Sequence, residues 1–125
     1  MAEPEDPHDV VRAVDEARAA LERVAAATSG PRSVTIVLYV TESASSLRAM
    51  RNLERFLREP HDVRVALRVW DLSREPLGPD AADDRVAFTP MLVKRAPPPR
   101  ERLLGDLQHR GLLEEVLVHA HERHP

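Results

Sequence analysis

The 125-residue sequence contains no cysteine. Disulfide bonds, thiol nucleophiles, thiolate metal sites and dithiol redox chemistry are therefore excluded. Aromatic residues are also scarce, with one tryptophan, one tyrosine and two phenylalanines, and the net charge is -3. A chain with few stacking platforms and no basic excess is not expected to bind nucleic acid.

Long hydrophobic runs are missing as well. The longest uninterrupted apolar run, residues 36–40, is far shorter than the roughly 20 residues that span a bilayer. The acidic N-terminal residues do not follow the basic-then-apolar pattern of a secretion signal. With 42% apolar residues, the sequence predicts a soluble, cytoplasmic globular protein without membrane contact, and nothing in it indicates a cofactor.

Charge is unevenly distributed along the chain. Residues 1–33 hold seven acidic residues and four arginines, while the remainder balances fourteen acidic with fourteen basic residues. An alanine-rich helix is predicted over residues 10–28, and Gly30-Pro31 ends it. We therefore divide the chain into an acidic N-terminal helical extension, residues 1–33, and a main domain, residues 34–125.

The predicted N-terminal helix carries an apolar stripe with alternating spacings of four and three. Its members are Val10, Val14, Ala17, Leu21 and Val24. The stripe can pack on the body of its own chain or be only partly ordered, or it can pair with a second copy as a short coiled coil and form a homo-oligomer. The small number of heptads and the alanine in the seam favour packing within the chain.

The main domain begins with a predicted parallel strand, helix and strand. Residues 34–40 are almost continuously apolar, as in a strand covered on both faces. Residues 47–57 show a helical apolar stripe, and residues 63–70 alternate. Because Arg64 and Arg68 fall on the second face of that alternation, one face of this strand is expected to be less buried.

A β-hairpin is predicted next. A Thr89-Pro90 step precedes an apolar strand at residues 91–93, since the residue before a proline favours extended geometry. Three prolines, residues 97–99, form a stiff turn, and a second short strand covers residues 100–104.

A short helix over residues 80–86 and a closing amphipathic helix over residues 112–120 complete the prediction. The resulting α/β order, β-α-β-(α)-β-β-α after the N-terminal helix, is that of a thioredoxin-like fold. In that fold the residue before the third strand is a cis-proline, and Pro90 stands at this position.

The positions where such a fold carries its chemistry are occupied by other residue types. A thioredoxin-like oxidoreductase has its two cysteines in the first strand-to-helix turn, where this chain reads TESASS at residues 41–46. Ser43 or Ser45 could act in place of cysteine, as in some transferases, but a helix cap explains both serines without chemistry. We therefore expect no catalytic residues and no enzymatic activity.

Three histidines near the C-terminus are candidate metal ligands. They are His119, His121 and His124, and their spacing does not place them on one helical face. The sequence therefore predicts no metal site.

Several segments together resemble the KaiB family of circadian-clock proteins. They read LYV with the serine-rich turn and LRAMRNLERFL, then VALRVWDLSREPL, then FTPMLVKRAPPPRERLLGDL. The most specific parts are V-x-D-L-x-x-x-P-L and the run from Thr89-Pro90 through three prolines to Gly-Asp-Leu. The resemblance covers about residues 34–123, which leaves the N-terminal extension outside the usual family body.

The resemblance implies a non-enzymatic protein that binds a hexameric KaiC-type ATPase in a clock or in related bacterial signalling. In the clock, such a protein helps to sequester KaiA and to displace a histidine kinase. The resemblance also implies two folds, a tetrameric ground state and a thioredoxin-like monomer that binds KaiC, which differ in the second half of the chain. A self-associating sensor or scaffold domain without redox activity is the alternative function.

Two departures from the family pattern bear on fold switching. The turn at residues 41–46 is one residue shorter than usual and lacks glycine and proline, and residues 116–118 read VLV where clock members carry Gly-Leu-Asp. Because valines suit a regular helix better than glycine does, we expect the thioredoxin-like form to persist, with the ground-state fold as the alternative.

Four residues are predicted to bind the partner protein. Three belong to the second strand and its end, Arg64, Arg68 and Asp71, and the fourth, Lys94, belongs to the hairpin. Solvated surface without a partner is the alternative interpretation of each.

Overall fold

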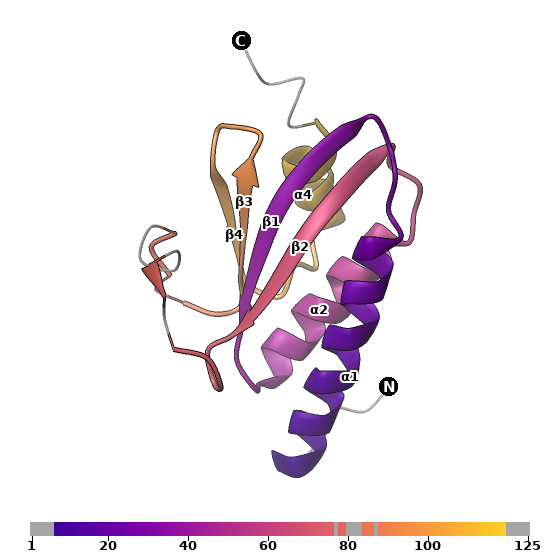
Figure 1. The fold of residues 1–125 in the computed structure, drawn as a ribbon. Helices are drawn as coiled ribbons and strands as arrows, with labels where there is room; N and C mark the ends of the chain where they lie inside the picture. The colour runs from indigo at the N-terminus through magenta and orange to yellow at the C-terminus, as the bar shows by residue number, and fades with distance from the viewer. Residues whose placement is uncertain (1–6, 77, 80–83, 87, 120–125) are drawn as a thin grey trace.

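The computed structural model describes residues 7–76, 78–79, 84–86 and 88–119. Figure 1 shows its elements, which are α1 Pro7–Ala26, β1 Arg32–Val40, α2 Ala44–Leu57, β2 Val63–Asp71, β3 Met91–Ala96, β4 Glu101–Leu104, α4 Arg110–Leu113 and a π-helical turn, η1 Glu114–Val118. The predicted short helix over residues 80–86 falls mostly on residues 80–83, outside the described ranges. Among the described helices, none has the length and apolar character that crossing a membrane requires.

The four strands form one sheet in the order β2-β1-β3-β4. β1 and β2 are parallel, with Arg32 opposite Val63 and Val40 opposite Asp71, so the predicted strand-helix-strand unit is present. β3 runs antiparallel to β1, and β4 pairs antiparallel with β3. This mixed sheet with its helices is the predicted thioredoxin-like arrangement, preceded by one N-terminal helix.

The described helices share one face of the sheet. Side chains from that face of β1 and β2 form a single buried cluster with α1, α2, α4 and η1. On the opposite face a smaller cluster contains Val37, Tyr39, Met91 and Val93. Residues 36–40 are therefore buried from both sides, as the continuous apolar run predicts.

The apolar stripe of α1 is part of the main core. Val14, Ala17 and Leu21 are 1%, 7% and 0% exposed, and Val10 and Val24 are partly buried against the same cluster. The helix therefore packs within its own chain, as the first of the two interpretations of the stripe states. These side chains are not available as the seam of a coiled coil in this structure.

The hairpin has the predicted strands and connections. The Thr89-Pro90 peptide bond is cis, which confirms the prediction, and the Ala96-Pro97 and Pro98-Pro99 bonds are also cis. The amide of Gly105 donates to the carbonyl of Pro90 over 3.0 Å and closes the open end of the hairpin.

The last helical segment differs from the regular amphipathic helix that the sequence predicts. α4 continues into the π-helical turn η1, which buries Val116 and Leu117 together with Leu113. Leu112, expected on the buried face, is 46% exposed. Residue 120, the last of the predicted helix, lies outside the described residues.

Candidate functional site

The open face of β2 carries the charged side chains that the sequence predicts for partner binding. Val63, Val65 and Val69 are buried under the helices. The residues between them face the other way because side chains alternate along a strand. Arg64 and Arg68 are exposed on that face, as the alternation in the sequence predicts.

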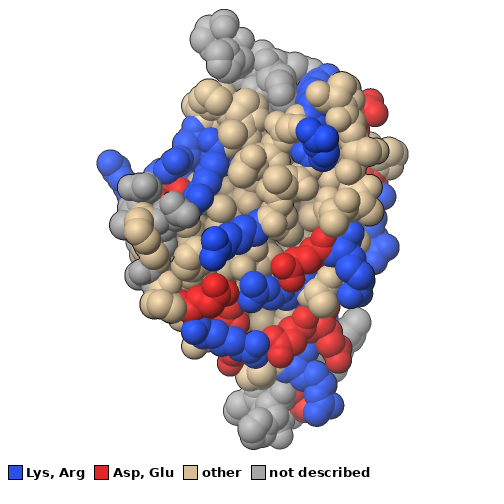
Figure 2. Space-filling model, in the orientation of Figure 1, with Lys and Arg blue, Asp and Glu red and all other residues tan. Residues whose placement is uncertain are grey.

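Arg68 is held in place next to the single tryptophan. Its guanidinium carbon lies 3.9 Å from the centroid of the Trp70 ring, and Nη2 lies 3.8 Å from Oε2 of Glu75. Nearer the start of the strand, Nη2 of Arg64 donates a 3.0 Å hydrogen bond to Oγ of Ser33. Figure 2 shows uncharged surface over the region of β1 and β2, bordered by basic side chains, with mixed acidic and basic side chains below it.

A buried carboxylate lies under the other half of this sheet face. Asp84 is fully buried, and its Oδ2 accepts hydrogen bonds from the Tyr39 hydroxyl at 2.6 Å and from Nη2 of Arg95 at 2.6 Å. Oδ1 accepts from Nη1 of Arg100 at 3.1 Å, and the Asp84 carbonyl accepts from Nε of Arg102 at 2.7 Å. One aspartate thus fixes three arginines of the hairpin and the tyrosine of β1.

The Asp84 cluster changes the acidity of its members. Burial raises the pKa of Tyr39 to about 12, and the hydrogen bond to the Asp84 carboxylate acts in the same direction. Burial alone would lower the pKa of Arg95, but its hydrogen bond to Asp84 raises it. Both shifts favour a neutral phenol and charged guanidinium groups, so the cluster stabilises the hairpin against β1.

The Asp84 cluster was not predicted from the sequence. The sequence contained one indication of it, which is two arginines on an apolar strand face. Val93 stands opposite Arg102 across the hairpin, and Arg95 lies on the same face as Val93. Arginines on a partly buried strand face need an acidic partner. The partner lies in a polar loop without periodicity, so its position could not be predicted.

Lys94 does not lie where the prediction of a partner contact requires. Its side chain is 0% exposed, and Nζ lies 3.3 Å from Oε2 of Glu101, the residue opposite it on β4. Alternation along β3 places Lys94 on the helix side with Leu92, because Val93 faces the other way. The assignment of Lys94 as a partner-binding residue is wrong for this structure.

Asp71 is also buried and has a structural role instead of the predicted binding role. It is 1% exposed. Its Oδ1 accepts from the amide of Ser73 at 2.9 Å, and its carbonyl accepts from the amides of Arg74 and Glu75. Short-range bonds of this kind are typical of an aspartate that forms a turn after a strand.

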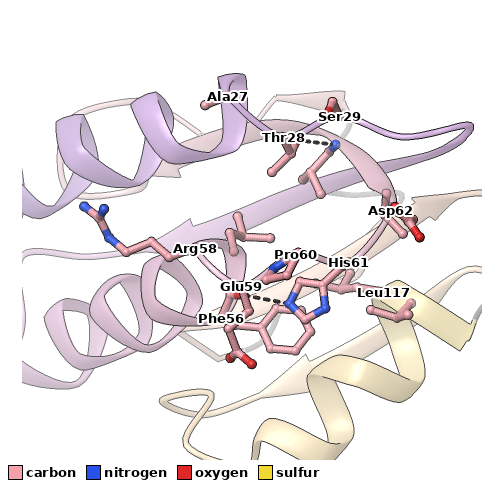
Figure 3. A pocket seen from close by; sticks show the side chains of 14 residues that line it. Ala27, Thr28, Ser29, Phe56, Arg58, Glu59, Pro60, His61, Asp62 and Leu117 are labelled. Atoms are coloured by element: carbon pink, nitrogen blue, oxygen red, sulfur yellow. Dashed lines mark hydrogen bonds between the residues drawn. The ribbon is translucent and has the colours of Figure 1, made fainter.

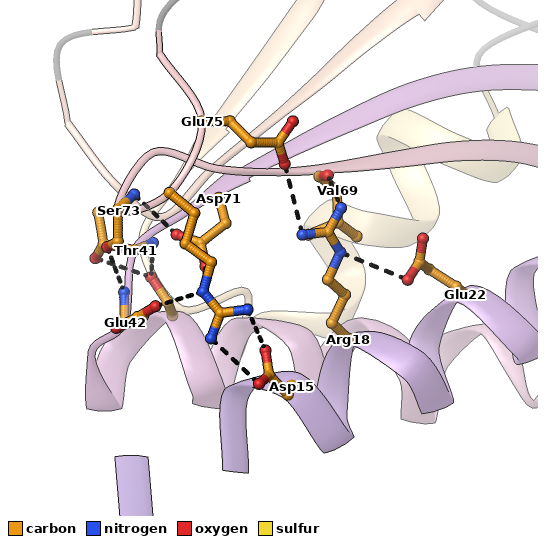
Figure 4. A network of polar contacts seen from close by, with 11 residues as sticks. Asp15, Arg18, Glu22, Thr41, Glu42, Val69, Asp71, Ser73 and Glu75 are labelled. Carbon is orange, nitrogen blue, oxygen red and sulfur yellow. Dashed lines mark hydrogen bonds and ion pairs between the residues drawn. The ribbon is translucent and has the colours of Figure 1, made fainter. Parts of the chain in front are cut away.

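A polar network ties α1 to the turn after β2 (Figure 4). Nη1 of Arg74 lies 2.9 Å from Oδ1 of Asp15, and Nε of the same arginine lies 2.7 Å from Oε1 of Glu42. The hydrogen bond to Asp15, followed by that to Glu42, raises the pKa of Arg74 above its ordinary value. One turn of α1 further on, Nη1 of Arg18 lies 3.6 Å from Oε1 of Glu75.

The serine-rich turn before α2 forms a helix cap. Oγ of Ser43 accepts a 3.2 Å hydrogen bond from the amide of Ser46, as expected for an N-cap residue. Ser43 also contacts the hydroxyl groups of Thr41 at 3.1 Å and Ser45 at 3.4 Å. Capping therefore accounts for the position of Ser43.

The histidines do not form a metal site in the described part of the chain. No group of three or more His, Cys, Asp or Glu side chains is arranged for a metal ion among the described residues. Nε2 of His119 lies 3.2 Å from Oε1 of Glu114, which lowers the pKa of that carboxyl group. His121 and His124 lie outside the described residues.

The cleft in Figure 3 lies where the C-terminal ends of α1 and α2 approach η1. Its volume is about 270 Å³, slightly below the range typical of small-molecule sites. His61, one of its lining residues, stacks on Phe56 with ring centroids 4.2 Å apart, and its Nε2 lies 2.7 Å from the Phe56 carbonyl oxygen. These contacts within the wall give His61 a structural role.

The family model and the similar proteins that this chain matches carry the same family name. Residues 37–118 match the family model described as KaiB domain. The chain is 34% identical over 88 residues to the circadian clock oscillator protein KaiB of Microcystis aeruginosa, which covers 70% of this chain and 80% of that protein. It is 37% identical over 90 residues to the protein of the same name from Prochlorococcus marinus strain MIT 9211, covering 70% and 75% of the two chains. The protein of the same name from Thermostichus vulcanus is 34% identical, and the match covers 70% of this chain and 77% of that protein.

Proposed function

Because this chain belongs to the KaiB family, we propose that it is a clock-type regulatory protein that binds a KaiC-type ATPase and acts through that binding. Its relatives are named circadian clock oscillator proteins. Such a protein acts by recognising a partner protein, and its localisation is the bacterial cytoplasm. A KaiA-like protein or a histidine kinase with a similar sensor domain would join or compete at the resulting complex.

The observation that carries the proposal is the open face of β2. Arg64 and Arg68 are exposed there, Ala66 between them is small and exposed, and Trp70 is partly buried at the end of the row. Arginine and tryptophan are the residue types most enriched at the energetic centres of protein interfaces. A flat strand face with these side chains fits a protein surface better than it fits a small molecule.

The charge of this face indicates what the partner presents. Arg68 has Glu75 as an acidic neighbour at 3.8 Å, and its side chain is 55% exposed. Arg64 donates to a neutral hydroxyl group. The guanidinium groups thus keep donors for carboxylates, and we expect the contacting surface of the ATPase to be acidic.

The two remaining predicted binding residues support the face indirectly. Asp71 shapes the turn that carries Glu75 toward Arg68, and Lys94 lies buried on the helix side of the hairpin. In the proposed complex, Arg64 and Arg68 contact the partner directly. Asp71 and Lys94 hold the strands that present this face.

Gel filtration of the protein mixed with a KaiC-type ATPase tests the proposal. We expect co-elution when the ATPase carries ATP, and loss of co-elution when both arginines are replaced by glutamate. Separate elution of the unaltered protein, both with ATP and without it, would contradict binding of such an ATPase.

A further inference from the structure

The outer edge of β2 is the longer free edge of the sheet. β2 pairs only with β1 in the described sheet, whereas the opposite edge is the four-residue strand β4. The amide of Leu72 donates to the carbonyl of Val40, so even-numbered backbone groups here face β1. The odd-numbered groups of β2, at residues 65, 67 and 69, therefore face outward.

Two of these outward groups are already bound by the N-terminal extension. Oγ1 of Thr28, just after α1, accepts a 2.8 Å hydrogen bond from the amide of Val65 (Figure 3). Nη2 of Arg18, within α1, donates a 2.9 Å hydrogen bond to the carbonyl of Val69 (Figure 4). The extension thus satisfies one donor and one acceptor on an edge that is otherwise open to another strand.

The spacing of these two contacts shows that α1 runs alongside β2. Ten residues separate Arg18 from Thr28, which is about 15 Å of helix. Four residues separate Val69 from Val65, which is about 13 Å of strand. The two lengths are similar, and the order is reversed, because the earlier residue of the extension contacts the later residue of the strand. Helix and strand therefore lie antiparallel over this stretch.

The same edge is complementary to itself. If two β2 strands paired antiparallel about Leu67, Val65 of one copy would stand opposite Val69 of the other, and the groups held by Thr28 and Arg18 would bond to each other. On the open face, Arg64 would stand opposite Trp70 of the second copy. An arginine over this indole is a contact that the chain already makes through Arg68.

We propose that α1 is an intramolecular cap that prevents the outer edge of β2 from pairing with the same edge of a second copy. The buried stripe and the ion pairs Arg18–Glu75 and Asp15–Arg74 hold the cap in place. The inference concerns self-association and goes beyond the proposed function. It is the reverse of a dimerisation arm, because loosening α1 creates a dimer instead of removing one.

An uncapped full-length variant tests the proposal. It combines Arg18→Ala and Thr28→Val, which remove both edge contacts, with Leu21→Ala, which weakens the buried stripe. Because the chain has no cysteine, a spin label attached through Ala66→Cys reports only on the exposed face of β2. We expect twice the monomer mass by light scattering at high concentration, and dipolar coupling between labels within about 20 Å, since the two positions are diagonal neighbours across paired strands.

A matched control separates edge pairing from general instability. Leu92→Ala removes a side chain that is 1% exposed in the same core but lies on β3, which β1 separates from β2. This control should keep its mass and show no coupling. The proposal is overturned if the uncapped variant remains monomeric while its Val65 amide exchanges faster with deuterium. It is also overturned if the unaltered chain is an oligomer and the uncapped variant has a lower mass, or if Leu92→Ala associates to the same extent as the uncapped variant.

Discussion

Gly30 lies so close to the backbone of Asp62 that a side chain added there would collide with it. A Cβ atom added there would lie 2.2 Å from the carbonyl carbon and oxygen of Asp62 and 2.7 Å from the nitrogen of Val63. Gly30→Ala must therefore push the start of β1 away from the start of β2. We expect a loss of about 2 kcal/mol in the free energy of unfolding, measured by urea denaturation.

Gly111→Ala is the matched control for this substitution. A Cβ atom at Gly111 meets no other heavy atom within 4 Å, and alanine favours a helix over glycine by about 1 kcal/mol. The control should be as stable as the unaltered chain or more stable. Equal effects of the two substitutions would show that Gly30 is not in close contact with Asp62.

Tyr39 allows a pH prediction that can be observed at a single residue. Its pKa is raised to about 12, first by burial and then by the Asp84 carboxylate. The fold favours the neutral phenol, so this stabilisation is present below pH 10 and is lost as the pH rises from about 10 to about 12. Because the chain has one tyrosine, tyrosinate absorbance should appear near pH 12 in the folded protein and near pH 10 in denaturant.

Asp84→Asn provides the comparison for the Tyr39 titration. It removes the charge that opposes ionisation of the phenol and keeps the size of the side chain. We expect the tyrosinate transition to move toward lower pH, at a temperature where circular dichroism shows that the variant is folded. A folded-state transition near pH 10 in the unaltered protein would contradict the buried Tyr39–Asp84 bond.

At the scale of residues, the sequence predicted which side chains of β2 are exposed better than it predicted which polar side chains are buried. Arg64 and Arg68 were placed correctly because alternation along β2 separates them from the buried valines. Applied to β3, the same rule would have placed Lys94 on the helix side with Leu92. The burial of Asp71 and Asp84 depends on how turns fold back on the strands, which periodicity does not encode.

At the scale of elements, α1 behaves as a core helix, and weakening its contact with the body should lower the stability of the protein. Leu21 is 0% exposed and belongs to the main hydrophobic cluster. Leu21→Ala should lower the free energy of unfolding by about 2 to 5 kcal/mol, the range for a buried leucine. Urea denaturation followed by circular dichroism measures this loss.

Leu112→Ala is the control, since Leu112 is 46% exposed. The same chemical change there should alter the free energy of unfolding by less than about 1 kcal/mol. If Leu21→Ala also has so small an effect, α1 does not pack on the body in solution.

The helices and strands that the sequence predicted are those with strong local patterns. The apolar stripes of α1 and α2, the alternation of β2 and the prolines of the hairpin each determine local geometry, and all four appear in the structure. The π-helical turn η1 was not predicted, because its residues also suit a regular helix. The contacts of Arg18 and Thr28 with β2 were not predicted either, since they depend on the tertiary position of the helix.

At the scale of the whole molecule, the thioredoxin-like arrangement should be the form that the protein maintains in solution. In this form β1 pairs with β3, and Val37 stands opposite Val93. We expect one set of amide resonances in NMR spectra, with cross-strand contacts between these two residues. Two sets of comparable intensity in slow exchange would show that the chain switches fold.

Binding of a KaiC-type ATPase through the open face of β2 is the central claim, and an affinity ratio tests it most directly. The dissociation constant should be measured by calorimetry for the unaltered chain, for Arg64→Glu with Arg68→Glu, and for Arg23→Glu with Arg55→Glu. The last pair changes the net charge equally at two exposed positions on α1 and α2. We predict that the β2 variant binds at least about tenfold more weakly, equivalent to about 1.4 kcal/mol, and that the helix variant binds like the unaltered protein. Equal affinities of the two variants, or no binding by any chain, would contradict the claim.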